Sequence, residues 1–349
     1  MPDESLKTYQ EVMDYLRRKK RKTNLLFGNG FSIGFEPDIF SYNALSNFIK
    51  KCKDINLLRL FKIVGSSNFE LIMRNLDLFI QFGKEFVPKA NLEEIIEPAK
   101  KLLKKNLLDA ITALHPEHVF EMPEEKSRSC ALFLKDFLNT KGEIFSTNYD
   151  LLLYWVLMRH ADIFNDNIRD GFTREDNEAL TWKSGTQNIH YLHGALPLFD
   201  LGHSILKEEY TGGAYLLQNI QKRINQDQYP IFVTAGTSQE KMEMISHSRY
   251  LSYCYEKLAN LDGSLVVIGF NFGDYDTHLI NAINQAATRR KNHNGLLASL
   301  FIGYYTEQDK MHLKEICPNL KIPQNKIRLF DSKTANIWNN KEENLLSSC

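Results

Sequence analysis

The chain has 349 residues, of which 43% are hydrophobic and 25% are charged, the composition of a globular protein that forms one large domain or two of ordinary size. Its 43 Lys and Arg equal its 43 Asp and Glu, so no net field favours nucleic acid or an acidic membrane surface. Apolar runs are only strand-sized and the first residues lack the apolar segment of a signal peptide, so we expect a cytoplasmic protein without a membrane span.

The five cysteines are scattered along the chain, and no two of them form a C-x-x-C pair. A structural zinc ribbon or knuckle is therefore excluded by its missing ligands. An odd, scattered set also argues against a disulfide framework, so we expect reduced thiols. The cysteines are Cys52, Cys130, Cys254, Cys317 and Cys349.

The first predicted element is an amphipathic helix from Leu6 to Leu16, where apolar side chains recur at helical spacing. A basic run follows from Arg17 to Lys22. Cations stabilise the C-terminal end of a helix through its dipole, and with a neutral overall charge we prefer this explanation to a nucleic-acid patch. No direct contact with nucleic acid is predicted.

A short strand at Asn24–Phe27 leads into a helical pattern from about Ala44 to Leu138, after which strands and helices alternate. This alternation is typical of an α/β protein with a doubly wound, mostly parallel sheet, here carrying an inserted helical module. Further strands are predicted at Ile144–Ser146, Ile189–Leu192, Pro230–Thr234, Ser264–Ile268, Leu297–Gly303 and Lys326–Phe330, with helices at Asp150–Arg159 and Thr277–Ala287.

The predicted domains follow from this pattern. They are an N-terminal helix (1–22), the α/β domain (23–43 and 139–330), the helical insertion (44–138) and a polar C-terminal tail (331–349). We expect the tail to be loosely attached.

Four segments at predicted strand ends carry polar or glycine residues suited to a site. In the first, Gly28-Asn29-Gly30-Phe31-Ser32, glycines let the backbone approach a phosphate, although such pairs also form plain turns. In the second, Ser146-Thr147-Asn148-Tyr149-Asp150, the side chains of Asn148 and Asp150 could hold a ribose or orient water. Alternatively, Thr147, Asn148 or Asp150 could simply cap the next helix.

The third segment, Leu192-His193-Gly194, places a histidine at a strand end, where it suits a general base, although most histidines are structural. The fourth runs from Val266 to His278 and contains Gly269-Phe270-Asn271-Phe272-Gly273, followed by Asp274 and Asp276. It is a second strand–turn–helix junction of the kind that binds nucleotides, and its acidic residues could equally favour the helix N-terminus.

In this order the four segments resemble the sirtuin-like domain, over roughly residues 24 to 305. The variant is most similar to bacterial sirtuin-like proteins of antiphage defence, which cleave NAD. The resemblance implies a Rossmann-like fold with NAD+ as substrate. It implies that Gly28, Gly30, Phe31 and Ser32 line the NAD site, that Asn148 positions water or ribose, that Asp150 closes that motif, that His193 is the catalytic histidine, and that Gly269 and Asn271 contact the adenosine half.

Two features depart from the deacylating sirtuins. The four-cysteine zinc module cannot be built, which puts an acyl-lysine groove in doubt, and no metal is expected. The segment Thr234-Ala235-Gly236-Thr237-Ser238 copies a sirtuin Gly-Thr-Ser element, but we assign that element to Gly269-Phe270-Asn271 and leave Gly236 to Ser238 as a loop of unknown purpose.

The resulting hypothesis is an NAD+ hydrolase that acts as a defence effector by depleting NAD. Such an enzyme needs a gate, either homo-oligomerisation or a second protein from the same operon, for instance one that senses nucleotides, and the helical insertion is the natural place for these contacts. Two alternatives stay open: an NAD-dependent protein deacylase or ADP-ribosyltransferase, and a non-catalytic sensor that binds NAD or ADP-ribose. A dehydrogenase is disfavoured because no G-x-G-x-x-G fingerprint is present.

Overall fold

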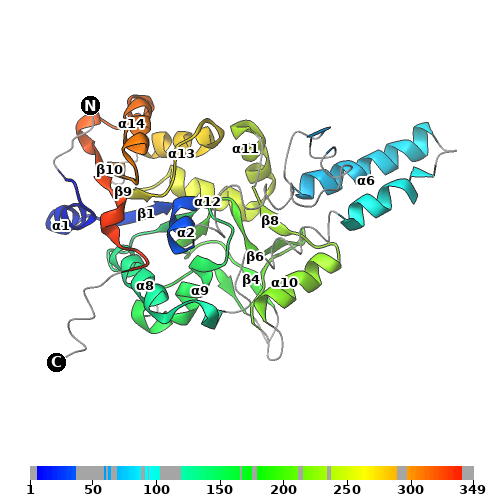
Figure 1. Ribbon diagram of the computed structural model, residues 1–349, viewed down its shortest axis with the longest axis horizontal. Coiled ribbons are helices and arrows are strands. Elements are labelled where there is room, and N and C mark those ends of the chain that lie inside the picture. The colour runs from blue at the N-terminus through cyan, green and yellow to red at the C-terminus, as the bar shows by residue number, and fades with distance from the viewer. Residues whose placement is uncertain are drawn as a thin grey trace.

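The computed structural model describes most of the chain (Figure 1). The residues described are 6–36, 59, 62–63, 69–87, 91–92, 94–102, 119–165, 167–174, 179–210, 215–233, 237–288 and 297–339. Among the helices in these ranges, none combines the length and apolarity needed to cross a bilayer.

A six-stranded sheet forms the centre of the molecule, in the order β11-β10-β9-β1-β2-β5. Every neighbouring pair in it is parallel. The first strand, β1, lies in the middle of the sheet. The chain next adds β2 and β5 on one side of β1, and then crosses back to add β9, β10 and β11 on the other side. This is the doubly wound order of Rossmann-type sheets, so the predicted α/β class is confirmed. The strands are β1 (Thr23–Phe27), β2 (Ile144–Ser146), β5 (Ile189–Tyr191), β9 (Gly263–Ile268), β10 (Leu297–Tyr304) and β11 (Ile327–Asp331).

Burial explains why these short segments are strands. All five residues of β1 are buried, as are five of the six in β9, because helices cover both faces of a parallel sheet. Asn24 is the polar exception inside β1, and its side chain is fully used. Its amide donates to the carbonyls of Asp262 and Ser264, and its oxygen accepts from the Glu143 backbone. One side chain thus ties together the amino ends of three strands.

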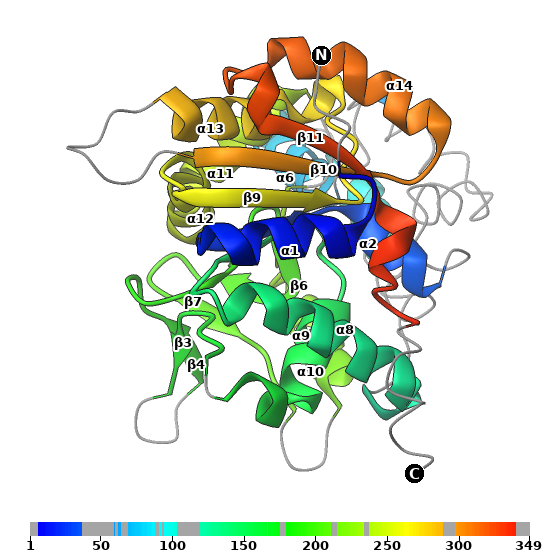
Figure 2. The same ribbon diagram turned by 90° about the vertical axis from the view of Figure 1, so that its left-hand side faces the viewer.

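Helices α1 and α8 lie against each other over one part of the sheet, joined by the Tyr9 hydroxyl and Asp136 (Figure 2). Thr8 and Glu11 form a capping box that begins α1, and Arg17, Arg18 and Lys19 occupy its last turn, as the dipole favours. Elsewhere α12 packs on β5 and on α13, and α13 and α14 pack on β10. The helices are α1 (Tyr9–Lys19), α2 (Asn29–Phe35), α6 (Phe69–Phe86), α8 (Glu124–Leu138), α9 (Leu152–Arg159), α10 (Leu216–Asn225), α11 (Ser238–His247), α12 (Arg249–Ala259), α13 (Thr277–Thr288) and α14 (Glu307–Ile316).

A second, antiparallel sheet of five strands was not predicted. Its order is β3-β4-β7-β6-β8, and it lies below the parallel sheet in Figure 2. The strand expected at Pro230 belongs here and pairs antiparallel with β6, so its assignment to the parallel series was wrong. The reason is the short connection after β5. Only two residues separate β5 from β6, whereas a parallel return needs a dozen or more, so β6 belongs to a separate antiparallel sheet, in which β8 pairs with it. The strands are β3 (Phe172–Thr173), β4 (Leu180–Trp182), β6 (Gly194–Asp200), β7 (Ile205–Lys207) and β8 (Pro230–Phe232).

The helical segment predicted between residues 44 and 138 contributes in two ways. Helix α8 packs on β1 and buries Phe133, Leu134 and Phe137, so it belongs to the layer that covers the sheet. Helix α6 instead projects from the body of the molecule (Figure 1). The start of the predicted module, from Ala44, lies outside the described residues.

The tail predicted after Asp331 is not loosely attached in its first part. Trp338 is only 4% exposed, its indole packs on Phe31 and Phe35, and its Nε1–H donates to the Phe31 carbonyl at 2.8 Å. One buried tryptophan supplies enough apolar area to hold this polar segment against α2, a contact that local composition does not reveal.

Candidate functional site

All four predicted segments lie at the carboxyl edge of the parallel sheet. They follow β1, β2, β5 and β9, which are adjacent in the order β9-β1-β2-β5. The point between β1 and β9 is where the chain reverses its direction of sheet building. In doubly wound folds, ligands bind in the crevice outside the strand ends at this point.

The two glycine loops pack directly on each other at this reversal. The Gly28 amide donates to the Ile268 carbonyl and the Gly30 amide to the Gly269 carbonyl at 2.9 Å. A Cβ on Gly30 would lie 2.6 Å from the Cα of Gly269, and Gly269 itself has φ +64°. Loop packing therefore requires glycine here. The amides of Gly28 and Gly30 already have carbonyl partners, as does that of Phe31, so in this structure these three are not available to a phosphate.

Asn29, between the two glycines, offers a different donor. Its side-chain Nδ2 is buried, and within the described part of the chain no acceptor meets it. A buried donor without a partner is costly, and such groups are rare unless a ligand or water completes them. The sequence showed Asn29 inside the glycine motif but gave no reason to single it out.

The side chains of Ser32, Asn148 and Asp150 form a hydrogen-bonded chain across the ends of β1 and β2. The Ser32 hydroxyl donates to Asp150 Oδ2 at 2.5 Å and accepts from Asn148 Nδ2 at 2.7 Å. Asp150 Oδ1 also accepts the Leu152 amide at the start of α9, but Leu151 holds the N-cap position and no side chain caps this helix, so the capping alternative for Asp150 is wrong. Burial raises the pKa of Asp150, although the Ser32 hydroxyl and the Leu152 amide oppose the shift.

This chain of contacts fixes the orientation of the Asn148 amide. Because Nδ2 is committed to Ser32, Oδ1 is the atom left to accept a hydrogen bond from water or a ribose hydroxyl. Asn148 is 7% exposed and Asp150 is 9% exposed, so the group is nearly closed to solvent.

His193 is placed by a tight turn between β5 and β6. Gly194 completes this turn with φ +82°, and a Cβ there would collide with the Ile231 carbonyl, so only glycine fits. The Leu192 amide donates to the Ser146 carbonyl, and the Leu196 amide donates to the Tyr149 carbonyl. The turn that carries His193 is thereby joined to the loop that carries Asn148.

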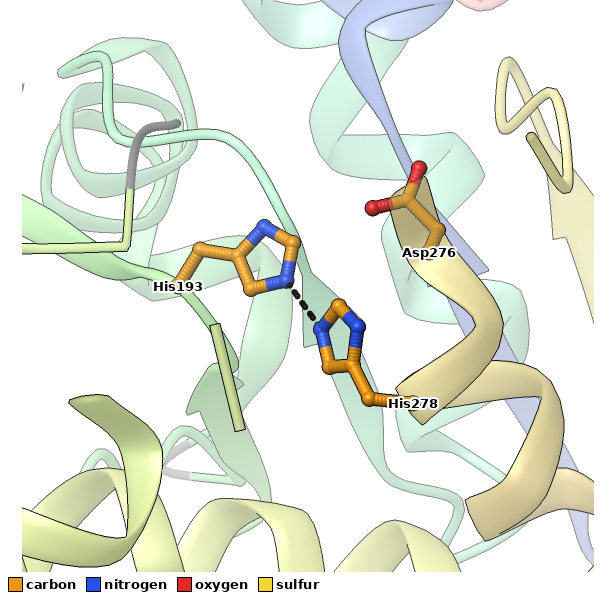
Figure 3. A group of neighbouring side chains, drawn as sticks. All are labelled: His193, Asp276 and His278. Atoms are coloured by element: carbon orange, nitrogen blue, oxygen red, sulfur yellow. Dashed lines mark hydrogen bonds between the residues drawn. The ribbon is translucent and has the colours of Figure 1, made fainter. Parts of the chain in front are cut away.

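The nearest partner of His193 is a second histidine, His278 in the first turn of α13 (Figure 3). Their Nε2 atoms are 3.0 Å apart and their rings are stacked. Burial lowers the pKa of His193 well below its usual value, and His278 and Lys241 add to the shift. Burial likewise lowers the pKa of His278, to about 4, so both rings are neutral at pH 7.

Three more residues surround this pair. The Ser238 hydroxyl accepts from the His278 amide at 2.7 Å and lies 3.4 Å from its Nδ1. Asp276 pairs with Lys241 at 2.8 Å in a largely buried contact. Sequence reasoning gave no role to His278, Ser238 or Lys241. The signal available was the position of His278, which ends the fourth segment two residues after Asp276.

The segment Thr234 to Ser238, to which the sequence assigns no purpose, ends at the site. Thr234, Ala235 and Gly236 lie outside the described residues, but Ser238 begins α11 and contacts His278.

Two predicted site residues are not brought into these clusters. Phe31 is 1% exposed, stacks on Phe27 and packs at a tilt against Trp338, as a core residue does. Asn271 is exposed, and its backbone carbonyl accepts from His312. A surface hollow of about 390 Å³ lies at the amino end of the sheet, beside Arg17, Lys20 and Thr23. None of the predicted site residues lines it.

Fold and site together define a Rossmann-like α/β protein with a nearly closed polar site at the carboxyl edge of its parallel sheet. The chain belongs to the family described as "Domain of unknown function (DUF4917)", whose sequence profile matches residues 25–338. A comparison with curated proteins found no match. The matched range runs from β1 to Trp338, and so includes both sheets and every residue of the site.

Proposed function

We propose that the chain hydrolyses NAD+ to nicotinamide and ADP-ribose. The observation that carries the proposal is the Ser32–Asn148–Asp150 network, which holds a carboxamide across the ends of β1 and β2, beside the switch point of a sheet with the dinucleotide-binding strand order. A carboxamide oxygen fixed in this way suits a water molecule or a ribose hydroxyl.

In the proposed reaction, water attacks C1′ of the nicotinamide ribose through an oxocarbenium-like transition state. The bond from C1′ to the pyridinium nitrogen breaks, and its electron pair leaves with nicotinamide. Asn148 Oδ1 orients the water and the ribose. His193, neutral at pH 7, accepts a hydrogen bond or a proton from the ribose hydroxyls or the water.

The rest of NAD+ is assigned to the glycine loops. Because the Gly28 and Gly30 amides donate to β9 and its loop, the Asn29 Nδ2, which meets no acceptor among the described residues, is the better donor for a phosphate or ribose oxygen at this edge. Gly269 keeps the two loops close enough for one ligand to touch both.

The nearly closed site supports a gated enzyme. Asn148, Asp150 and His193 are each less than one-tenth exposed, so NAD+ can enter only if the segments that cover these three side chains move apart. Helix α6 projects from the body and exposes Phe79, Phe82 and Phe86 on one stripe, which suits contact with a second copy or another protein. We place the enzyme in the bacterial cytoplasm as an antiphage effector that depletes NAD once such a contact opens it.

The test is nicotinamide release from NAD+ by the purified chain, alone and with the proteins encoded beside it, followed by chromatography. Asn148→Ala should abolish release, whereas Asn139→Ala, an exposed position at the amino end of the sheet, should leave it unchanged. Circular dichroism checks that both variants are folded. Release that continues unchanged in folded Asn148→Ala would overturn the assignment.

A non-catalytic NAD or ADP-ribose sensor is the second candidate, and the same closed site favours it. Here Asn148 and Asn29 would bind the ligand without a cleavage step. Calorimetry separates the two functions: NAD+ bound by the wild type, lost in Asn148→Ala, with no nicotinamide released under any condition, would favour the sensor.

A further inference from the structure

The histidine pair lies within a set of three side chains with the chemistry of metal ligands. A nitrogen of His193, a nitrogen of His278 and a carboxylate oxygen of Asp276 all lie within 4.8 Å of one another (Figure 3). They come from two segments of the chain: the turn after β5, and the junction of the short 3-10 helix Asp274–Asp276 with the first turn of α13. Tertiary folding brings His193 to the other two.

The two imidazole rings face each other through their Nε2 atoms. Their Nε2 atoms are 3.0 Å apart, a separation that suits either one shared proton or two lone pairs on a common cation. Two ligands of a tetrahedral zinc ion, each about 2.1 Å from the metal, are about 3.4 Å apart, so a small ring movement admits the ion.

Ser238 favours the form of His278 that can bind a metal. Its hydroxyl already accepts the His278 amide and lies 3.4 Å from Nδ1. A proton on Nδ1 directed at this oxygen leaves Nε2 with a lone pair that faces His193. Ligating histidines commonly have their other ring nitrogen held in this way.

Asp276 completes the set and connects it to solvent. Lys241 contacts its Oδ1, which leaves the second oxygen for a cation. The Asp276 side chain is 15% exposed, whereas His193 is 6% exposed and His278 is 3% exposed, so an ion would enter past the carboxylate. Two imidazoles and one carboxylate, with positions left open for water, are the ligand set of many zinc and iron(II) sites.

We propose that His193, His278 and Asp276 bind a divalent first-row transition-metal ion, for which Zn²⁺ is the best fit. The proposal revises the expectation, drawn from the missing cysteine pairs, that the chain needs no metal. It goes beyond NAD cleavage and does not depend on it. A metal on Nε2 would occupy the lone pair that His193 offers as a base, so the loaded and the metal-free chain would differ in activity.

The experiment measures metal binding without NAD+. The full chain is stripped with a chelator, and Zn²⁺ binding is followed by calorimetry. One Zn²⁺ per chain is expected, with affinity reduced at least about tenfold in each of His193→Ala, His278→Ala and Asp276→Asn, because even the partners of metal ligands contribute this much. His203→Ala, in the exposed turn between β6 and β7, is the matched control and should bind as the wild type does.

Co²⁺ spectra show which kind of side chain binds the metal and reveal any binding by cysteine. Co²⁺ in the site should give visible d–d absorption without the near-ultraviolet charge-transfer band of a thiolate ligand. Lys241→Gln should tighten binding severalfold, because it removes a positive charge beside Asp276. The absence of stoichiometric binding, or binding that survives intact in folded His278→Ala and Asp276→Asn, would overturn the proposal.

Discussion

His190 and His193 are both buried and three residues apart, yet their surroundings differ in kind. Gln187 contacts Nδ1 of His190 at 3.1 Å, and Nε2 lies 2.8 Å from Glu143. With Gln187 donating and Glu143 accepting, both nitrogens are satisfied and the ring is held in one neutral form. His193 instead faces another imidazole at 3.0 Å. Burial alone therefore does not mark a functional histidine; its partners do.

The two histidines also occupy opposite ends of the sheet. Glu143 precedes β2 and pairs with Lys22, which precedes β1, so the His190 cluster fastens the amino ends of the strands. His193 lies beyond the carboxyl end of β5, where ligands of this fold bind. One end of the sheet carries a satisfied structural network, and the other carries groups that still have bonding capacity.

Replacing each of these two histidines by alanine should give the largest difference in nicotinamide release. His193→Ala should reduce nicotinamide release by at least about 100-fold, because a general base contributes this much, while the unfolding transition stays near that of the wild type. His190→Ala should leave turnover per folded molecule nearly unchanged.

The His190→Ala substitution should instead lower the free energy of unfolding. It removes a buried partner of the Glu143 carboxylate and leaves a cavity, so we expect a loss of about 2–4 kcal/mol in the free energy of unfolding. Urea denaturation and the chromatographic assay, run on both variants, measure the contrast. Equal effects of the two substitutions on turnover would remove the distinction.

The amino-end cluster should also make the protein sensitive to acid. Burial opposes the ionisation of Glu143, but the hydrogen bond from His190 and the charge of Lys22 outweigh it and lower its pKa to about 2. Since the unfolded carboxyl has a pKa near 4.5, its contribution of about 3 kcal/mol is present above pH 4.5 and is lost as the pH falls towards 2.

His190 acts in the same direction. Burial lowers its pKa below 6.5, so the neutral ring stabilises the fold and this contribution is lost as the pH falls below 6.5. Urea midpoints for the wild type should fall between pH 7 and pH 3, and Glu143→Gln should flatten the lower part of that curve. Parallel curves for the two proteins would show that Glu143 is not responsible.

The smallest expected effect concerns the glycine loops at the carboxyl edge. In Gly30→Ala the new Cβ would meet the Cα of Gly269 at 2.6 Å, while alanine gains helix propensity, so we expect a net loss of about 1–2 kcal/mol. Gly273→Ala is the matched control, because φ there is −67° and nothing lies within 4 Å of the added Cβ.

Thermal unfolding of the two glycine variants, with NAD+ titrated into each, makes this measurement. Gly30→Ala should also weaken NAD+ binding, since the two loops must separate, whereas Gly273→Ala should behave as the wild type. If Gly30→Ala is as stable as Gly273→Ala, close packing of the loops is not what requires glycine at position 30.

Local pattern predicted the parallel sheet well. Runs such as Leu265-Val266-Val267-Ile268 are buried on both faces, so apolarity alone marks them as central strands, and β2 begins and ends where the sequence placed it. Three strands of the antiparallel sheet, β3, β4 and β7, have only two or three residues, and β3 and β4 are incompletely buried, which leaves little periodicity to read.

The candidate site was predictable only where its residues follow strands directly. Asn148, Asp150 and His193 could be placed at one edge because the carboxyl ends of parallel strands meet there. Ser238, Lys241 and His278 are separated from His193 by 45 to 85 residues along the chain, and no local pattern links them.

The sequence by itself determined the fold class and the edge of the sheet at which chemistry could occur, because strand burial and strand-end residues are local properties. Tertiary structure decided which histidine faces another, that the glycine amides are used within the protein, and that Trp338 holds the tail on α2. These outcomes depend on contacts between distant segments, whose geometry is fixed only when the two sheets and their helices pack together.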